Sequence, residues 1–143
     1  MATVVHDNFR NAQMGNPGGT TTTVDFDADE IRCSLLDQSD SGAITAATEN
    51  YGQVDTPTVV ANSSALTSKT VGSVATGVFD AANVTFSTVT GDAADYLTLY
   101  KHNATPANAP LIVTWDSATT GLPVTPNGGD ITVTWNGSGI VQI

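Results

Sequence analysis

Four carboxylates between positions 25 and 30 form the densest group of side chains in this 143-residue chain that could do chemistry. Asp25, Asp27 and Asp29 alternate, and Glu30 follows directly. Carboxylates at every second residue can converge on a hard cation, and Asp-x-Asp-x-Asp opens an EF-hand calcium loop. The rest of that loop is missing, because position six is Glu30 instead of Gly and position twelve is Leu36 instead of Glu. We therefore favour a solvated acidic edge strand over a calcium site.

The remaining reactive residue types are sparse. His6 and His102 are the only histidines and Cys33 is the only cysteine, so the spacing of a zinc site is absent. Cys33 shares a strand face with Ile31 and Leu35, which indicates a buried structural thiol. The sequence contains neither a Gly-x-Ser-x-Gly nucleophile elbow nor a Gly-x-x-x-x-Gly-Lys phosphate loop. We predict that the protein is not an enzyme and binds no cofactor or metal.

The charge balance restricts the partners. Four basic and fourteen acidic residues give a formal net charge of −10, which disfavours nucleic acid and anionic membranes. A basic protein surface would suit the chain better, although the acidity also serves solubility. No apolar run is long enough to span a membrane, and no signal peptide is visible, so we expect a protein used without secretion.

The elements that must position these residues are short strands. From residue 31 onward, Thr- and Val-rich segments alternate with Gly, Pro, Asn and Asp turns, as β-strands require. In the segment 130–135, Ile131, Val133 and Trp135 share one face, and a turn then leads to a final strand as a hairpin. The pattern predicts an all-β protein, an antiparallel β-sandwich or jelly roll with a short N-terminal helix. The predicted strands are 31–36, 57–62, 65–71, 74–79, 83–89, 95–101, 110–116, 130–135 and 139–143.

The alternation also predicts which side chains form the core. Trp115 and Trp135 share the apolar phase of their strands, so we expect core packing for both instead of ligand stacking. The predicted core residues are Phe79, Val84, Phe86, Leu97, Leu99, Leu111, Val113, Trp115, Ile131, Val133, Trp135 and Ile140.

Residues 1–23 are predicted to form an N-terminal arm, and residues 24–143 a single β-sandwich domain. Val5, Phe9 and Ala12 recur at helical spacing, with Asp7 as N-cap and Gly15 as stop. So short a helix is not stable alone, and it must dock on its own domain or on a neighbour. Of the two, we favour the neighbour.

A second contact surface is predicted on the strand at 95–101. Tyr96 and Tyr100 lie on the face opposite the leucines of that strand, where they could form an interface or remain half-buried sheet residues. The polar loop 37–56 is long enough to suggest function, and it carries a further tyrosine. The predicted partner-binding residues are Val5, Phe9, Arg10, Tyr51, Tyr96 and Tyr100.

The order of the segments resembles a family of small tailed-bacteriophage virion proteins, described as structural or decoration proteins. The resemblance covers most of residues 25–143, with one departure at 49–53, where such proteins often carry a Gly-Tyr-x-x-Gly-Gly turn. The matching segments are DEIRCSLL at 29–36, ALTSKTV at 65–71, FDAANVTF at 79–86, ADYLTLY at 94–100, APLI at 109–112, GDITVTW at 129–135 and the Gly-Ile pair at 139–140.

The resemblance implies a non-enzymatic virion component that is assembled in a bacterial cytoplasm. We expect a capsid decoration or cement protein on the capsid surface, bound to the major capsid protein or other virion proteins. Many weak symmetric contacts would stabilise the head shell, with a homo-oligomer, most simply a trimer, as the unit. The alternatives are a tail, neck or fibre-base subunit, or a carbohydrate- or host-surface-binding module, which requires an exposed Trp115 or Trp135.

Overall fold

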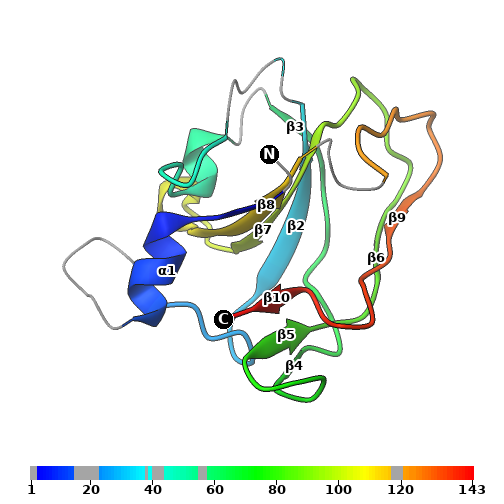
Figure 1. Ribbon diagram of the computed structural model, residues 1–143. Helices are drawn as coiled ribbons and strands as arrows, with labels where there is room; N and C mark the ends of the chain where they lie inside the picture. The colour runs from blue at the N-terminus through cyan, green and yellow to red at the C-terminus, as the bar shows by residue number, and fades with distance from the viewer. Residues whose placement is uncertain (1–2, 15–22, 38, 40–43, 55–57, 117–120) are drawn as a thin grey trace.

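A five-stranded antiparallel sheet, with strand order β1-β8-β7-β2-β3, lies at the centre of the computed structural model (Figure 1). The structure describes residues 3–14, 23–37, 39, 44–54, 58–116 and 121–143. In the order of the sheet, the strands are β1 (Thr3–Val5), β8 (Leu111–Trp115), β7 (Tyr96–Lys101), β2 (Ile31–Leu36) and β3 (Val59–Asn62).

Two smaller antiparallel sheets complete the fold. The first has the order β10-β5-β4 and the second pairs β6 with β9. The predicted all-β, sandwich-like class with one short helix near the N-terminus is confirmed. The remaining elements are β4 (Thr70–Val71), β5 (Val78–Asp80), β6 (Val84–Phe86), β9 (Ile131–Val133), β10 (Val141–Gln142), the helix α1 (Asp7–Gln13) and the 3-10 turns η1 (Tyr51–Gln53) and η2 (Pro106–Asn108).

The main hydrophobic core lies between the five-stranded sheet and the smaller sheets. Period-two alternation sends Ile31, Cys33 and Leu35 of β2 into it, and the leucines of β7 lie beside them. Seven of the predicted core residues are buried: Phe79, Val84, Phe86, Leu97, Leu99, Leu111 and Val113. The other five are only half-buried and pack against the edge of the core: Trp115, Ile131, Val133, Trp135 and Ile140.

A β-bulge in β8 changes which face its residues occupy. Leu99 pairs with Val113 and Tyr100 pairs with Leu111, so Ile112 is the extra residue between them. The bulge lets Ile112 and Val113 both join the main core, whereas Leu111 packs on the opposite face of the sheet.

That opposite face is buried as well. A second apolar cluster covers it, contributed partly by the sheet and partly by the segment that runs across it between residues 44 and 54. Antiparallel sheets commonly leave one face to solvent, but here the central strands are covered on both sides. The cluster consists of Leu36, Ile44, Tyr51, Val54, Tyr96, Tyr100, Ala109 and Leu111, with Val59 packed against it.

The N-terminal residues belong to the same folded unit. β1 pairs with β8 in the register Thr3–Trp115 to Val5–Val113, so Val5 is a strand residue and not the first turn of the helix. α1 begins at Asp7, which is therefore not the N-cap, and buries Phe9 against Phe26 at 5.7 Å between ring centroids. The prediction of an arm that reaches a neighbour is wrong for residues 3–14, and Gly15 lies outside the described residues.

Two further sequence predictions are wrong. β9 and β10 do not form a hairpin, because β9 pairs with β6 and β10 pairs with β5. Residues 24–29 form a turn and not an edge strand, closed by a hydrogen bond from the Asp29 amide to the Asp25 carbonyl at 2.8 Å. The first error arises because alternation does not specify the partner of a strand. The second arises because Asp side chains can bond nearby backbone amides and so favour a turn over a strand.

Replacement of Phe9 by Ala tests whether the N-terminal helix is part of the core. Phe9 is 2% exposed, so its loss leaves a cavity and should cost about 3–5 kcal/mol of unfolding free energy. The neighbouring Arg10 is exposed, and Arg10→Ala should leave the stability nearly unchanged. Urea denaturation followed by circular dichroism measures both variants. Equal midpoints for the two would contradict the docking of α1.

Candidate functional site

The six residues predicted to bind a partner do not share a surface. Tyr51, Tyr96 and Tyr100 are buried in the second apolar cluster, and Phe9 is buried in the main core. Of the two others, Val5 is half-buried in β1 and Arg10 is exposed on α1, 3.7 Å from the Asp7 carboxylate. The interpretation of the tyrosines as an exposed contact face is therefore wrong, and the sheet-packing alternative describes them better.

The tyrosine cluster is held together by stacking and hydrogen bonds. The rings of Tyr51 and Tyr100 stack with centroids 4.2 Å apart and planes 9° apart. The Tyr51 hydroxyl donates to Asn62 Oδ1 at 2.7 Å and lies 3.1 Å from Ser34 Oγ. Burial, together with the neighbouring Tyr51, raises the pKa of Tyr100 to about 12. These contacts attach the segment 44–54 to the sheet, which is a packing role.

The acidic loop uses its own carboxylates to form its turn. Asp25 Oδ1 accepts the amides of Asp27 and Ala28 at 3.0 and 3.1 Å, and Asp29 Oδ2 accepts the Asp25 amide at 2.7 Å. Asp29 also pairs with Lys101 Nζ at 2.8 Å. Among the described residues, no group of three or more His, Cys, Asp or Glu side chains could hold a metal ion. The carboxylates that suggested a calcium loop therefore stabilise a turn.

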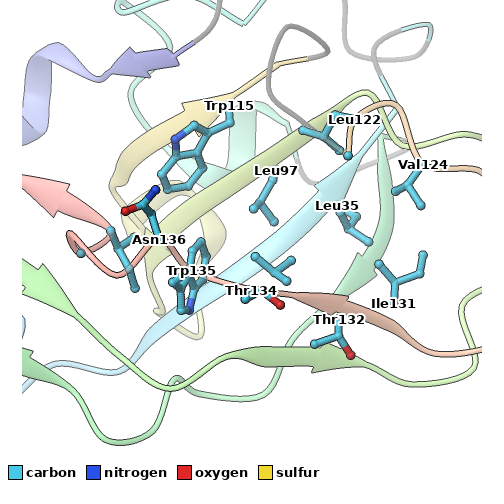
Figure 2. A pocket seen from close by; sticks show the side chains of 14 residues that line it. Leu35, Leu97, Trp115, Leu122, Val124, Ile131, Thr132, Thr134, Trp135 and Asn136 are labelled. Carbon is cyan, nitrogen blue, oxygen red and sulfur yellow. The ribbon is translucent and has the colours of Figure 1, made fainter.

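The candidate functional site is an open apolar cleft between the five-stranded sheet and the β6–β9 pair (Figure 2). Its volume is about 600 Å³, within the range of ligand-binding clefts. One wall is formed by Leu35, Leu97 and Trp115 of the large sheet. The opposite wall and the rim are formed by Gly121, Leu122, Val124, Ile131, Thr132, Val133, Thr134, Trp135, Asn136, Gly139 and Ile140.

Two tryptophans lie together in this cleft. The ring centroids of Trp115 and Trp135 are 5.9 Å apart and the ring planes are tilted by 43° (Figure 2). Two hydrogen bonds to the segment before β6 hold Trp135 in place. Its indole N–H donates to the Ala82 carbonyl at 3.1 Å, and its backbone amide donates to Asn83 Oδ1 at 3.0 Å. Both rings are half-buried, so each keeps a surface that a ligand can reach. Side chains of this type dominate the binding energy of protein interfaces.

The sequence did not predict the cleft. The alternating pattern places Trp115 and Trp135 on the apolar faces of their strands, and the sequence therefore predicts both in the core. The pattern does not specify whether another part of the chain covers that face. One signal was present: Leu122 and Val124 are apolar residues in a Pro-containing segment without a strand pattern. Apolar side chains outside strands commonly cover or line a cavity, and both line this cleft.

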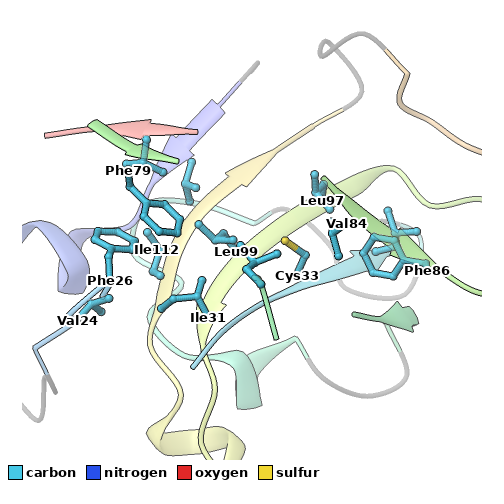
Figure 3. Close-up of a cluster of buried hydrophobic side chains, with 14 of the residues drawn as sticks. Val24, Phe26, Ile31, Cys33, Phe79, Val84, Phe86, Leu97, Leu99 and Ile112 are labelled. Atoms are coloured by element: carbon cyan, nitrogen blue, oxygen red, sulfur yellow. The ribbon is translucent and has the colours of Figure 1, made fainter. Parts of the chain in front are cut away.

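Cys33 lies in the main core (Figure 3). It is not among the residues that line the cleft. Its side chain is fully buried among apolar residues, and this burial raises the pKa of the thiol far above its usual range. A thiol that stays protonated is a poor nucleophile and a poor metal ligand. The prediction of a buried thiol is confirmed.

Two acidic residues are neighbours in sequence of cleft residues, but neither lines the cleft. Asp116 directly follows the cleft residue Trp115, and Asp130 directly precedes the cleft residue Ile131. Asp130 Oδ1 accepts the Thr88 amide at 2.9 Å. Burial and, less strongly, the Asp116 carboxylate raise the pKa of Tyr96, which packs on the face of the sheet opposite the cleft.

Leu35 and Leu97 of the cleft lie on β2 and β7. At the other end of these two strands, Lys101 of β7 is the ladder partner of Ile31 of β2. At the rise of a β-strand, Lys101 lies about 13 Å from Leu97.

The four basic side chains of the chain are engaged away from the cleft. Arg32 pairs with Glu30, and Lys101 pairs with Asp29. Lys69 Nζ donates to the Asp27 carbonyl at 3.1 Å, while the remaining cation, Arg10, lies on α1. None of the four lines the cleft.

His6 is a second feature that the sequence did not explain. The ring is fully buried between α1 and the large sheet, where Nε2 lies 2.9 Å from Thr114 Oγ1, which lies 2.7 Å from Thr98 Oγ1. Burial lowers the pKa of this imidazole to about 4, although the nearby Thr48 backbone and Asp7 favour the protonated form. The neutral ring is therefore the form that the fold selects.

Comparison with known proteins does not assign this site. No protein family matches the chain, and no curated protein matches it significantly. In the part of the chain that the structure describes, no helix is long and apolar enough to cross a membrane.

The buried imidazole predicts a pH-dependent stability. The unfolded chain binds a proton at His6 below about pH 6.5, whereas the folded chain does so only below about pH 4. Stability is therefore complete above the unfolded pKa and falls as the pH decreases through this window, by about 1.4 kcal/mol per pH unit at most. His6→Gln should flatten the pH dependence of urea midpoints between about pH 7 and pH 5.

His102→Gln serves as the matched control, because it removes the other histidine and leaves the His6 ring in place. A pH dependence that persists unchanged in His6→Gln and disappears in His102→Gln would contradict the assignment.

Proposed function

We propose that this chain is a non-enzymatic bacteriophage virion protein, a capsid decoration or cement protein that stabilises the head shell. Two observations support the proposal. The resemblance of most of residues 25–143 to virion structural proteins suggests the class. The open apolar cleft with Trp115 and Trp135 at its wall is the observation that carries a binding role.

The fold suits a protein that must withstand force while attached to a shell. Both faces of the central sheet are covered, so the domain presents a stable body from which the cleft opens. Multivalent attachment then needs only weak individual contacts, because effective concentration strengthens each further contact in a lattice. The partner is the major capsid protein, and a homo-oligomer, most simply a trimer, forms the repeating unit. The capsid surface is the proposed location, after assembly in the bacterial cytoplasm.

A copy-number measurement tests this proposal. Quantitative mass spectrometry of purified phage particles, produced by the phage whose genome encodes this chain, should find hundreds of copies of the chain per particle. A decoration protein repeats with the lattice, whereas a tail, neck or fibre-base subunit occurs in a few copies. A few copies would replace the capsid assignment by the tail alternative, and particles without the chain would refute a virion role.

A carbohydrate- or host-surface-binding module is the second candidate, because Trp115 and Trp135 are both reachable at the cleft. Sugars stack on aromatic rings, but they also need polar groups that fix their hydroxyls. The polar side chains that line the cleft are Thr132, Thr134 and Asn136, and Thr132 Oγ1 lies 3.0 Å from Thr85 Oγ1. The composition of the cleft therefore favours an apolar protein segment over a sugar.

Tryptophan fluorescence separates the two candidates. Under the decoration proposal, titration with bacterial surface oligosaccharides should leave the emission of Trp115 and Trp135 unchanged. A saturable quench or blue shift that Trp135→Phe abolishes would favour the sugar-binding module.

A further inference from the structure

We propose that Asn136 is a site of spontaneous deamidation, in which the neutral side-chain amide at the rim of the cleft becomes a carboxylate. This modification goes beyond the proposed function and does not depend on it, because the reaction needs only this chain and water. The chain contains two Asn-Gly pairs, Asn127-Gly128 and Asn136-Gly137, and both are exposed. The two pairs differ in the hydrogen bond of the glycine amide, which is the nucleophile of the reaction.

The reaction begins when base removes the proton of the Gly137 amide. The nitrogen then attacks Cγ of Asn136 and closes a five-membered succinimide ring, while Nδ2 takes up a proton and leaves as ammonia. Water next opens the ring at one of its two carbonyl carbons. Cleavage at Cγ gives an aspartate, whereas cleavage at the backbone carbonyl gives an isoaspartate, in which the chain continues through Cγ. Neither product requires an oxidant or a reductant, and each replaces a neutral amide by a carboxylate.

Gly137 supplies an accessible nucleophile. Its amide donates to no oxygen among the residues that the structure describes, so base in the solvent can reach the proton. Glycine lacks a Cβ, so no side chain at this position shields the nitrogen. The Gly128 amide, in contrast, donates to the Val89 carbonyl at 2.9 Å. A hydrogen-bonded amide loses its proton only when the local structure opens, so the fold protects Asn127 from the same reaction.

The turn at 136–139 holds the electrophile in place. Asn136 Oδ1 accepts the Ser138 amide at 2.8 Å, and the Asn136 carbonyl accepts the Gly139 amide at 2.9 Å. The first bond folds the side chain back over the Gly137 peptide, as in an Asx turn, and brings Cγ beside the attacking nitrogen. Negative charge develops on Oδ1 during the attack, and the Ser138 N–H that already points at this oxygen stabilises the charge.

The product changes the cleft at a defined place. Asn136 lines the cleft beside Trp135, whose ring is half-buried (Figure 2). Transfer of a carboxylate from water into a contact is costly unless the contact supplies a partner for the charge. Deamidation therefore weakens an apolar contact at this rim as the protein ages.

Peptide mapping by mass spectrometry tests the assignment in the folded, full-length chain. After incubation at mildly alkaline pH in heavy-oxygen water, the peptide with Asn136 should lose ammonia and gain one solvent oxygen. The peptide with Asn127 should keep its amide. Gly137→Ala is the matched variant, because a Cβ at this position meets no atom within 4 Å and the φ of Gly137 is not left-handed. It should slow the reaction at Asn136 several-fold, since the methyl group crowds the attacking nitrogen.

The same measurement in urea isolates the contribution of the fold. In the unfolded chain both Asn-Gly pairs should react at similar rates, because the hydrogen bond to Val89 no longer protects Gly128. Faster reaction at Asn127 than at Asn136 in the folded chain would overturn the proposal, and so would an unchanged rate in Gly137→Ala. Retention of both amides in the folded chain, with loss of both in urea, would also overturn it, because the turn would then protect Asn136.

Discussion

Burial of the central strands on both faces is the constraint on which the rest of this structure depends. β2 and β7 carry apolar residues toward the main core and polar or aromatic residues toward the other side. Ser34, Thr98 and Thr114 on that second side are buried, so their hydroxyls must find partners inside the protein. His6 and Tyr51 supply them, and this requirement explains why the N-terminal segment and the segment 44–54 pack where they do.

The bulge at Ile112 adapts β8 to the same constraint. Without an extra residue, Leu111 and Val113 would point to one face and the second cluster would lose its leucine. With it, Leu111 joins the second cluster while Ile112 and Val113 both join the main core. One inserted residue thus lets a single strand serve two cores.

The cleft arises where the second layer is incomplete. The β6–β9 pair stands beside the large sheet and meets it through Phe86 and Val84, but Trp115, Ile131 and Trp135 remain half-buried. Contiguous apolar surface left open in a folded domain is costly in water and is commonly kept for a binding role. Here it lies away from the Asp29–Lys101 ion pair of the acidic loop. The body of the domain and its proposed contact site are thus spatially separate.

The sequence by itself determined the class of the fold, the position of most strands and the burial of Cys33, because these follow from residue type and period-two alternation. Tertiary structure alone decided which strands pair, as the separation of β9 from β10 shows. It also decided that Tyr96 and Tyr100 are buried while Trp115 and Trp135 are reachable, which reverses the roles that the strand pattern predicted. The physical reason is that alternation assigns a side chain to a face, whereas exposure depends on what another part of the chain places over that face.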